Sequence, residues 1–302
     1  MARDLHNKPF DEGTITKLAI FERYLEKWLP VFLYQPGTKI VNIFDFFCGP
    51  GTDREQLKGS PLLAIDIINE YAEHIIKNQT KIKIFFNDRN KEKTENLTEE
   101  VSNYPLNKNL AEVKISNESF EENFDSYFNL MTRRDTANFL FIDQSGFKNF
   151  PPSIFQKITK LNKTDSLFFI ASSFAKRFKD HEQVSRTVPA FKSDEINEIS
   201  HLHIHRDICK SYKKMVPSGV TYYLAPFSIK KKSNVYGLIF GSGHLRGLNK
   251  FLETCWDIDK KSGEANFNIH GDFPESDQFF LSDELNKPKK WRSLKSILKK
   301  KY

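Results

Sequence analysis

The stretch FDFFCGPGTDRE, residues 44–55, decides how the fold of this 302-residue sequence is interpreted. An apolar run reaches Asp45, and after two Phe and a Cys the chain breaks into Gly-Pro-Gly at 49–51. Glycine permits positive φ angles and lets the backbone approach a ligand closely. The stretch therefore predicts either a cofactor-binding loop at the end of a strand or a tight turn between two buried elements.

Helical and extended patterns alternate along the rest of the chain. Apolar residues at helical spacing indicate helices over 14–32, 60–78, 91–104, 120–131, 151–161, 193–215 and 246–259. Short apolar runs indicate strands over 39–47, 81–86, 111–116, 137–143, 165–172, 219–229 and 235–243. This alternation predicts an α/β fold with a mostly parallel central sheet and helices on both faces. We place this domain at 39–259, between an N-terminal helical segment (1–38) and a C-terminal extension (260–302).

The first two expected helices carry recognisable signals at their starts. Thr14 or Thr16 is the expected N-cap of the first helix. Ser60 is the expected N-cap of the second, with Pro61 at its first position. Lys17 is a lone lysine on the apolar first helix, and we expect it to be solvated.

Polar residues follow several of the expected strands, at the edge where α/β sheets bind their ligands. The loop after the first strand lacks both G-x-G-x-x-G and a Gly-Lys-Ser/Thr sequence, which disfavours a phosphate cradle. Such a loop suits a cofactor with little phosphate, such as S-adenosylmethionine. Asp88, after the second strand, would either accept hydrogen bonds from ribose hydroxyls or, like Asn90, cap the following helix.

The fourth expected strand stops at Asp143, within the stretch DQSGF. A carboxylate there, with a backbone carbonyl beside it, would accept hydrogens from an exocyclic amine. Phe147 would stack on a base, and Gly146 would give the backbone room. The alternative is a strand-ending Asp followed by a simple turn.

Composition favours a folded protein with a basic end. Hydrophobic residues make up 39% and charged residues 28% of the chain, so a core is possible. The net charge is +7, but residues 286–302 hold eight basic residues and no acidic one, and without them the net charge would be −1. Such a block contacts phosphate or is a solvated end. The expected nucleic-acid contacts are Lys289, Lys290, Arg292, Lys295, Lys299 and Lys300.

Cysteine and histidine usage indicates neither a disulfide framework nor a metal centre. Cys48, Cys209 and Cys255 are far apart, which suits a reducing cytoplasm. The sequence shows no signal-peptide pattern and no run near the ~18 apolar residues that a membrane span needs. His201, His205 and Cys209 share one helical face, but three ligands on one helix cannot close a tetrahedron. We therefore expect a cytoplasmic protein with no metal and no membrane contact.

The order of these stretches resembles the three-Cys-motif partner (TcmP) proteins, a bacterial and phage family with a methyltransferase-like fold. TKLAIFERYLEKWLP is similar to that family's opening helix, and FDFFCGPG with GSPLLAI is similar to its glycine loop and next helix. FIDQSGFKNFPPSIFQKI is similar to its fourth strand and turn. YYLAPF and YGLIFGSGHLRGLNKFLETCWDID are similar to its closing strands and helix. The resemblance covers residues 14–259.

The resemblance implies a Rossmann-like, S-adenosylmethionine-dependent methyltransferase fold and a nucleic-acid target, with the exocyclic amine of a base as acceptor. The fourth-strand turn is similar to the D-P-P-[YF] motif of enzymes that methylate such amines. The implied catalytic residues are Asp143, Gln144 and Phe147. The implied cofactor-binding residues are Asp45, Phe47, Gly49, Gly51, Asp88 and Asn117. Family members usually have Pro where this chain has Gln144, and because Pro rigidifies the turn, the catalytic geometry stays open. Many members also have His where this chain has Leu18.

Two alternatives to methyl transfer onto nucleic acid remain at this point. The first is a non-catalytic partner protein that keeps the fold and binds nucleic acid or another protein within a phage-related or antiviral defence gene cassette. The family's gene neighbour, a radical-S-adenosylmethionine-like protein with three cysteines, is then a possible partner. The second is a nuclease, although no two carboxylates lie at a spacing that demands a metal.

Overall fold

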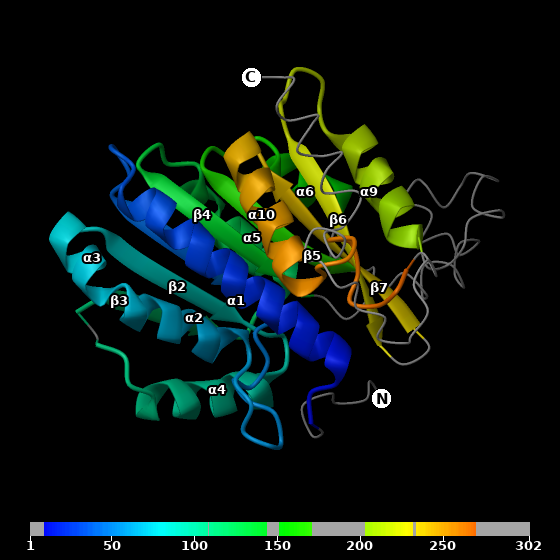
Figure 1. The fold of residues 1–302 in the computed structure, drawn as a ribbon. Coiled ribbons are helices and arrows are strands. Elements are labelled where there is room, and N and C mark those ends of the chain that lie inside the picture. Colours follow the sequence, from blue (N-terminus) through cyan, green and yellow to red (C-terminus); the bar gives the residue numbers. More distant parts are fainter. Residues whose placement is uncertain (1–8, 108, 144–150, 171–202, 232–233, 270–302) are drawn as a thin grey trace, which may run out of the picture.

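A seven-stranded sheet forms the centre of the computed structural model, which describes residues 9–107, 109–143, 151–170, 203–231 and 234–269 (Figure 1). The strand order is β3-β2-β1-β4-β5-β7-β6. The strands are β1 (Ile40–Asp45), β2 (Lys81–Asn87), β3 (Ala111–Ser116), β4 (Thr136–Ile142), β5 (Thr164–Ile170), β6 (Tyr223–Lys231) and β7 (Asn234–Ser242). Strands β1 to β5 pair in parallel, whereas β7 is antiparallel to both β5 and β6. The predicted fold class, a mostly parallel α/β sheet, is confirmed.

Helices connect the strands and cover the sheet. They are α1 (Glu12–Leu33), α2 (Ser60–Glu70), α3 (Ala72–Asn78), α4 (Lys91–Asn103), α5 (Phe120–Met131), α6 (Pro152–Ile158), α9 (Ile204–Met215) and α10 (Leu245–Ile258). None of the helices in these ranges is long and apolar enough to cross a membrane. Several predicted positions lie outside the described residues: Gln144, Gly146, Phe147, His201 and the basic residues of 286–302.

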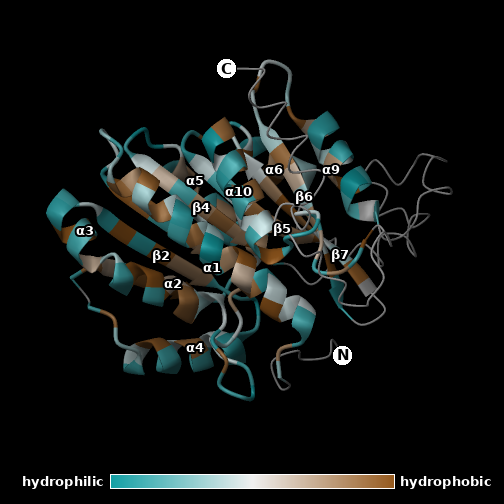
Figure 2. Ribbon diagram, viewed as in Figure 1, coloured by the Kyte–Doolittle hydropathy of each residue, from teal (hydrophilic) through white to brown (hydrophobic). Residues whose placement is uncertain are grey.

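A hydrophobic core lies on each face of the sheet. Helices α1, α2, α3 and α10 pack against one face, and α5, α6 and α9 pack against the other. Figure 2 shows the central strands largely hydrophobic, as expected for strands that are covered on both faces. The burial pattern agrees, because every residue of β1 and β4 is buried.

Helix α1 belongs to the same core as the sheet. The Phe21 and Phe141 rings lie 4.7 Å apart between centroids, and Trp28 lies 5.5 Å from Phe139. Burying such side chains stabilises the fold by about 1.5–3 kcal/mol each. The start of α1 lies beside the carboxyl end of β6, where Lys231 pairs with Asp11 at 2.6 Å. The first turns of α1 therefore lie at the edge of the sheet where ligands of α/β folds bind.

The starts of the first two helices differ from the prediction. Asp11 caps α1, and its side chain accepts a hydrogen bond from the Thr14 backbone at 3.0 Å, so neither Thr14 nor Thr16 is the cap. Gly59 is the N-cap of α2. The Ser60 hydroxyl is directed to another partner, described below. The predicted helix 60–78 is two helices, α2 and α3, separated at Tyr71.

Candidate active site

The carboxyl ends of β1, β2 and β4 bring the predicted site residues to one edge of the sheet. Strand β1 lies between β2 and β4. From β1 the chain adds β2 and β3 on one side, and it then crosses over to add β4 and β5 on the other side. Such a reversal of strand order is where doubly wound sheets bind their ligands. Asp45, Asp88 and Asp143 come at or directly after the ends of these three strands.

The glycine loop after β1 adopts backbone angles that favour glycine. Gly49 has φ 66° and Gly51 has φ 98°, both in the left-handed region. A Cβ on Gly51 would lie 3.0 Å from Leu97 of α4, so the space beside it is filled by the protein itself. The Gly51 carbonyl accepts a hydrogen bond from Gly59 at 2.7 Å, which closes the loop before α2. Local packing thus accounts for Gly51, whereas ligand contact by either glycine stays a prediction.

Asp45, the last residue of β1, is a buried carboxylate with an exposed fraction of 1%. Its side chain accepts hydrogen bonds from the Ser60 hydroxyl at 2.6 Å and from the Phe47 backbone at 3.2 Å. The pKa of Asp45 is raised to about 7, chiefly by burial and to a lesser extent by the charge of Asp143, although these two hydrogen bonds and Lys17 act in the opposite direction. Asp45 thus changes charge near neutral pH, which is typical of functional sites.

Lys17 contradicts the expectation that it is solvated. It is 9% exposed, and its ammonium forms an ion pair with the Asp143 carboxylate at the end of β4. The same ammonium lies 5.2 Å from the centre of the Phe169 ring. The physical reason is the position of α1, which directs this residue at the strand ends instead of into water. Sequence reasoning missed this contact, although a lysine on an apolar helix face was a usable signal.

Asp88, after β2, holds the glycine loop to its neighbour strand. Its carboxylate accepts hydrogen bonds from the backbone of Gly49 at 3.2 Å and of Asn90 at 2.8 Å. Asn90, and not Asp88, caps α4 by accepting from the Glu92 backbone. A carboxylate has about four acceptor positions, so two such bonds leave capacity for a ribose hydroxyl. That ribose contact stays a prediction.

The remaining predicted cofactor residues lie beside this network. Phe47 is half-buried, with its ring centre 5.6 Å from that of Phe120. Asn117 is exposed and donates to the Asp88 carbonyl at 2.8 Å. Asn87, which the sequence did not single out, is buried and donates to the carbonyls of Phe46 and Glu118. These contacts fix the strand ends relative to one another.

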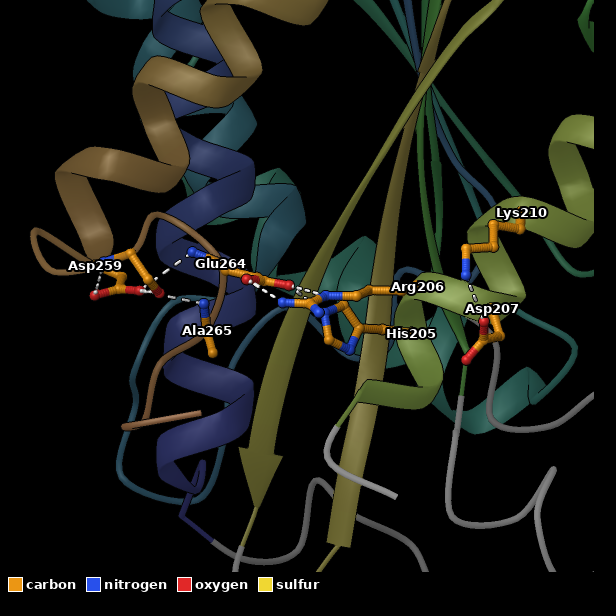
Figure 3. A network of polar contacts seen from close by, with 8 residues as sticks. His205, Arg206, Asp207, Lys210, Asp259, Glu264 and Ala265 are labelled. Carbon is orange, nitrogen blue, oxygen red and sulfur yellow. Dashed lines mark hydrogen bonds and ion pairs between the residues drawn. The ribbon is translucent and has the colours of Figure 1, made fainter. Parts of the chain in front are cut away.

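The histidine face that was weighed as a metal site has another partner. His205 lies 3.3 Å from a carboxylate oxygen of Glu264, and Arg206 donates to both oxygens of the same group (Figure 3). Burial alone would raise the pKa of Glu264, but these hydrogen bonds outweigh it and hold the pKa well below its usual range. Within the described ranges, no three His, Cys, Asp or Glu side chains form a metal-binding group.

Seven strands in this order, with one reversed strand and helices on both faces, form the Rossmann-like fold of S-adenosylmethionine-dependent methyltransferases. No family model and no curated protein matches the sequence. Among solved structures, protein LPL1258 of Legionella pneumophila str. Philadelphia 1, from family DUF519, is similar with a TM-score of 0.47 and 10% identity, over 81% of this chain and 92% of that chain.

Two O-methyltransferases are also similar to this chain. One is TomG of Streptomyces achromogenes, solved with S-adenosylmethionine, with a TM-score of 0.40 and 9% identity over 77% of this chain and 90% of that chain. The other is the O-methyltransferase of Bacillus cereus, solved with S-adenosylhomocysteine, with a TM-score of 0.40 and 9% identity over 79% of this chain and 83% of that chain.

Proposed function

We propose that this protein is an S-adenosylmethionine-dependent methyltransferase that acts on an exocyclic amine of a nucleic-acid base. One observation carries the proposal: a positive-φ glycine loop, the buried Asp45 and the strand-end Asp143 meet at the reversal of strand order. Buried carboxylates beside a glycine loop fit a ligand with hydroxyl and ammonium donors and few phosphate contacts. When bound, S-adenosylmethionine supplies an activated methyl group.

In this proposal the residues of the chain bind the cofactor and position the acceptor, and they form no covalent bond with either. Asp45 and Asp88, with the backbone of the glycine loop, bind the cofactor at the ends of β1 and β2. Asp143 accepts a hydrogen bond from the acceptor amine and holds its lone pair in line for transfer. A base within a duplex has to leave the stack to reach this edge of the sheet. Gln144 and Phe147 would complete the acceptor side.

Isothermal titration with S-adenosylhomocysteine tests the cofactor part of the proposal. The protein is first unfolded, freed of any copurified ligand and refolded, and the absence of released nucleoside is checked by chromatography. We expect saturable binding with one ligand per chain. Absence of binding to protein that melts cooperatively would overturn the proposal.

The acceptor class requires a separate measurement. The protein is incubated with S-adenosylmethionine that carries a labelled methyl group and with RNA or DNA of mixed sequence. The modified nucleoside is identified after digestion. We expect an N-methylated base in one of the two. Methylation of proteins or small molecules alone would contradict the nucleic-acid part and leave the cofactor part standing.

The basic tail is proposed to hold the nucleic-acid backbone. Its residues 286–302 bring eight positive charges and no negative one. Neutralising phosphates releases counterions, so binding should weaken steeply with salt. A chain that ends at residue 285 should bind nucleic acid more weakly and with a shallower salt dependence, while it keeps its affinity for S-adenosylhomocysteine. An unchanged salt dependence would exclude the tail from binding.

A non-catalytic partner role is the second candidate, and one observation favours it. Lys17 occupies Asp143 with an ion pair. The sequence also has Gln144 where the family that it resembles usually has Pro. In this proposal the protein keeps the fold, lies in the cytoplasm and binds a three-Cys-motif protein. Coexpression and pull-down with such a protein tests it. If the unmodified protein transfers methyl groups and Asp143→Asn abolishes this transfer, the result counts against the non-catalytic role.

A further inference from the structure

Helix α9 carries the largest excess of positive charge among the helices that the structure describes. It has four basic residues and one acidic residue, whereas α2 has two acidic residues and α5 has three, and neither has a basic one. Helix α4 has four acidic residues and two basic ones. A polyanion near this molecule is therefore repelled by α2, α4 and α5 and attracted to α9.

The lysines of α9 lie on the side of the helix that faces away from the sheet. The opposite side is buried in the core and includes Ile208 and Tyr212. Lys210, Lys213 and Lys214 are exposed. Residues three or four positions apart are neighbours on a helix surface, about 5–6 Å apart between Cβ atoms. The three ammonium groups therefore lie close together in water.

Carboxylates neutralise only part of this charge. Lys210 pairs with Asp207 at 3.1 Å, but the Lys210 side chain is still 72% exposed. Among the residues that the structure describes, no carboxylate forms an ion pair with Lys213 or Lys214. An exposed ion pair contributes little, about 0–1 kcal/mol, so a phosphate group can replace Asp207 as the partner of Lys210 at small cost.

Contacts at the start of α9 connect this helix to the ligand edge of the sheet. Arg206, in the first turn, donates to both carboxylate oxygens of Glu264 (Figure 3). The Glu264 carbonyl accepts a hydrogen bond from the Ser228 backbone at 2.7 Å, near the end of β6. Lys230, also in β6, is exposed and lies on the α9 face, because side chains alternate along a strand and Ile229 belongs to the core on the other face. Lys230 thus extends the positive charge from α9 to the ligand edge.

We propose that the phosphate backbone of the nucleic acid binds along a basic strip formed by Lys210, Lys213, Lys214 and Lys230. The inference rests on the proposed function, and it adds a contact surface that is separate from the basic tail. Phosphate contacts position a nucleic acid but carry no base information. The basic strip therefore orients the substrate along the α9 face, while selection of the base belongs to the candidate active site.

The salt dependence of nucleic-acid binding by the full-length protein tests the basic strip. Fluorescence anisotropy with labelled RNA or DNA of mixed sequence gives the Kd over about 50 to 300 mM salt. The double variant Lys213→Gln, Lys214→Gln removes two charges. The slope of log K against log salt should become shallower by about one for each lysine. At ~100 mM salt, binding should weaken by roughly 10-fold or more.

Two control variants and one further measurement make the result specific to the basic strip. Lys77→Gln with Lys81→Gln removes the same charge from exposed lysines of α3 and β2, away from α9, and should change the slope little. Lys213→Arg with Lys214→Arg keeps both charges and should retain binding. The affinity for S-adenosylhomocysteine should be equal in all variants. Thermal melts confirm that each variant is folded.

The possible outcomes distinguish failure of the inference from failure of the proposed function. If the unmodified protein binds neither RNA nor DNA, the nucleic-acid part of the proposed function is wrong, and the inference is wrong with it. If it binds and the α9 double variant matches the control pair in slope and affinity, only the basic strip is wrong. Lost binding to vesicles of phosphatidylserine and phosphatidylcholine, with nucleic-acid binding unchanged, would overturn the inference and assign α9 to a membrane surface.

Discussion

Asp45 and Asp165 are two buried carboxylates at opposite edges of the same sheet. Asp45 ends β1 and is 1% exposed, and Asp165 is the second residue of β5 and is 5% exposed. Burial raises the pKa of Asp45 to about 7 and that of Asp165 to about 6. Judged by burial and pKa alone, both would be candidates for a functional group.

Their surroundings distinguish them. Asp165 accepts a hydrogen bond from the Tyr24 hydroxyl at 2.6 Å, and a Cβ on Gly247 would lie 2.9 Å from its carboxylate, so it is enclosed by protein groups. Asp45 instead lies near a second carboxylate, a lysine and a loop with positive φ angles. A perturbed pKa thus indicates a site only where neighbouring charges and an open edge accompany it.

The largest expected effect is a loss of methyl transfer that occurs at the edge of the sheet with Asp45 and Asp143 and not at the edge with Asp165. Asp143→Asn should lower methyl transfer by about 100-fold or more, because the acceptor amine loses a charged hydrogen-bond partner. Asp165→Asn, at the other edge, should leave transfer per folded molecule within about twofold, since no reacting group lies there. The measurement is incorporation of label into nucleic acid. Equal losses in both variants would show that neither carboxylate acts directly.

The pH dependence of stability should differ between the two carboxylates. Both pKa values are raised above the value near 3.8 of a free aspartate, so the folded state binds more protons than the unfolded state. Each group therefore makes the free energy of unfolding fall as pH rises, by at most ~1.36 kcal/mol per pH unit. The fall extends to about pH 7 for Asp45 and to about pH 6 for Asp165.

Substitution by asparagine removes each contribution in turn. Urea unfolding between pH 4.5 and 7.5 compares Asp45→Asn and Asp165→Asn with the unmodified protein. The stability difference should change with pH for both variants, and the change should continue to higher pH for Asp45→Asn than for Asp165→Asn. A difference that is constant from pH 4.5 upward for Asp45→Asn would mean that this group ionises normally.

Tyr24→Phe should affect stability without affecting ligand binding. It removes the hydroxyl that donates to Asp165 and leaves a buried carboxylate short of a partner, which costs about 1–3 kcal/mol. Tyr222→Phe is the matched control, because its hydroxyl contacts the neutral Ser166 at 3.1 Å. The control should cost less, about 0.5–1.5 kcal/mol. A smaller loss for Tyr24→Phe than for Tyr222→Phe would contradict the enclosed, structural role of Asp165.

Local patterns predicted the elements, but not the contacts between distant ones. Helical spacing and apolar runs located every strand of the sheet, because these signals are set by neighbours along the chain. The pairing of Lys17 with Asp143 joins residues 126 positions apart and depends on where α1 crosses the sheet. Ser60 was interpreted as a helix cap from its neighbours along the chain. Its actual partner, Asp45, comes into contact with it only through the fold of the loop between them, which local patterns do not show.

The smallest expected effect is that of Ser60→Ala, and it tests the Asp45 side of the comparison directly. The substitution removes one hydrogen bond to Asp45 and should cost about 1 kcal/mol. Because that bond lowers the pKa of Asp45, its loss should extend the fall in stability to higher pH than in the unmodified protein. Ser102→Ala, which removes an exposed hydroxyl bonded to the Glu99 carbonyl at 2.8 Å, should leave the pH profile unchanged. If Ser60→Ala also leaves it unchanged, the Ser60 hydroxyl does not act on the charge of Asp45, and burial, the Phe47 backbone hydrogen bond and the neighbouring charges set its pKa.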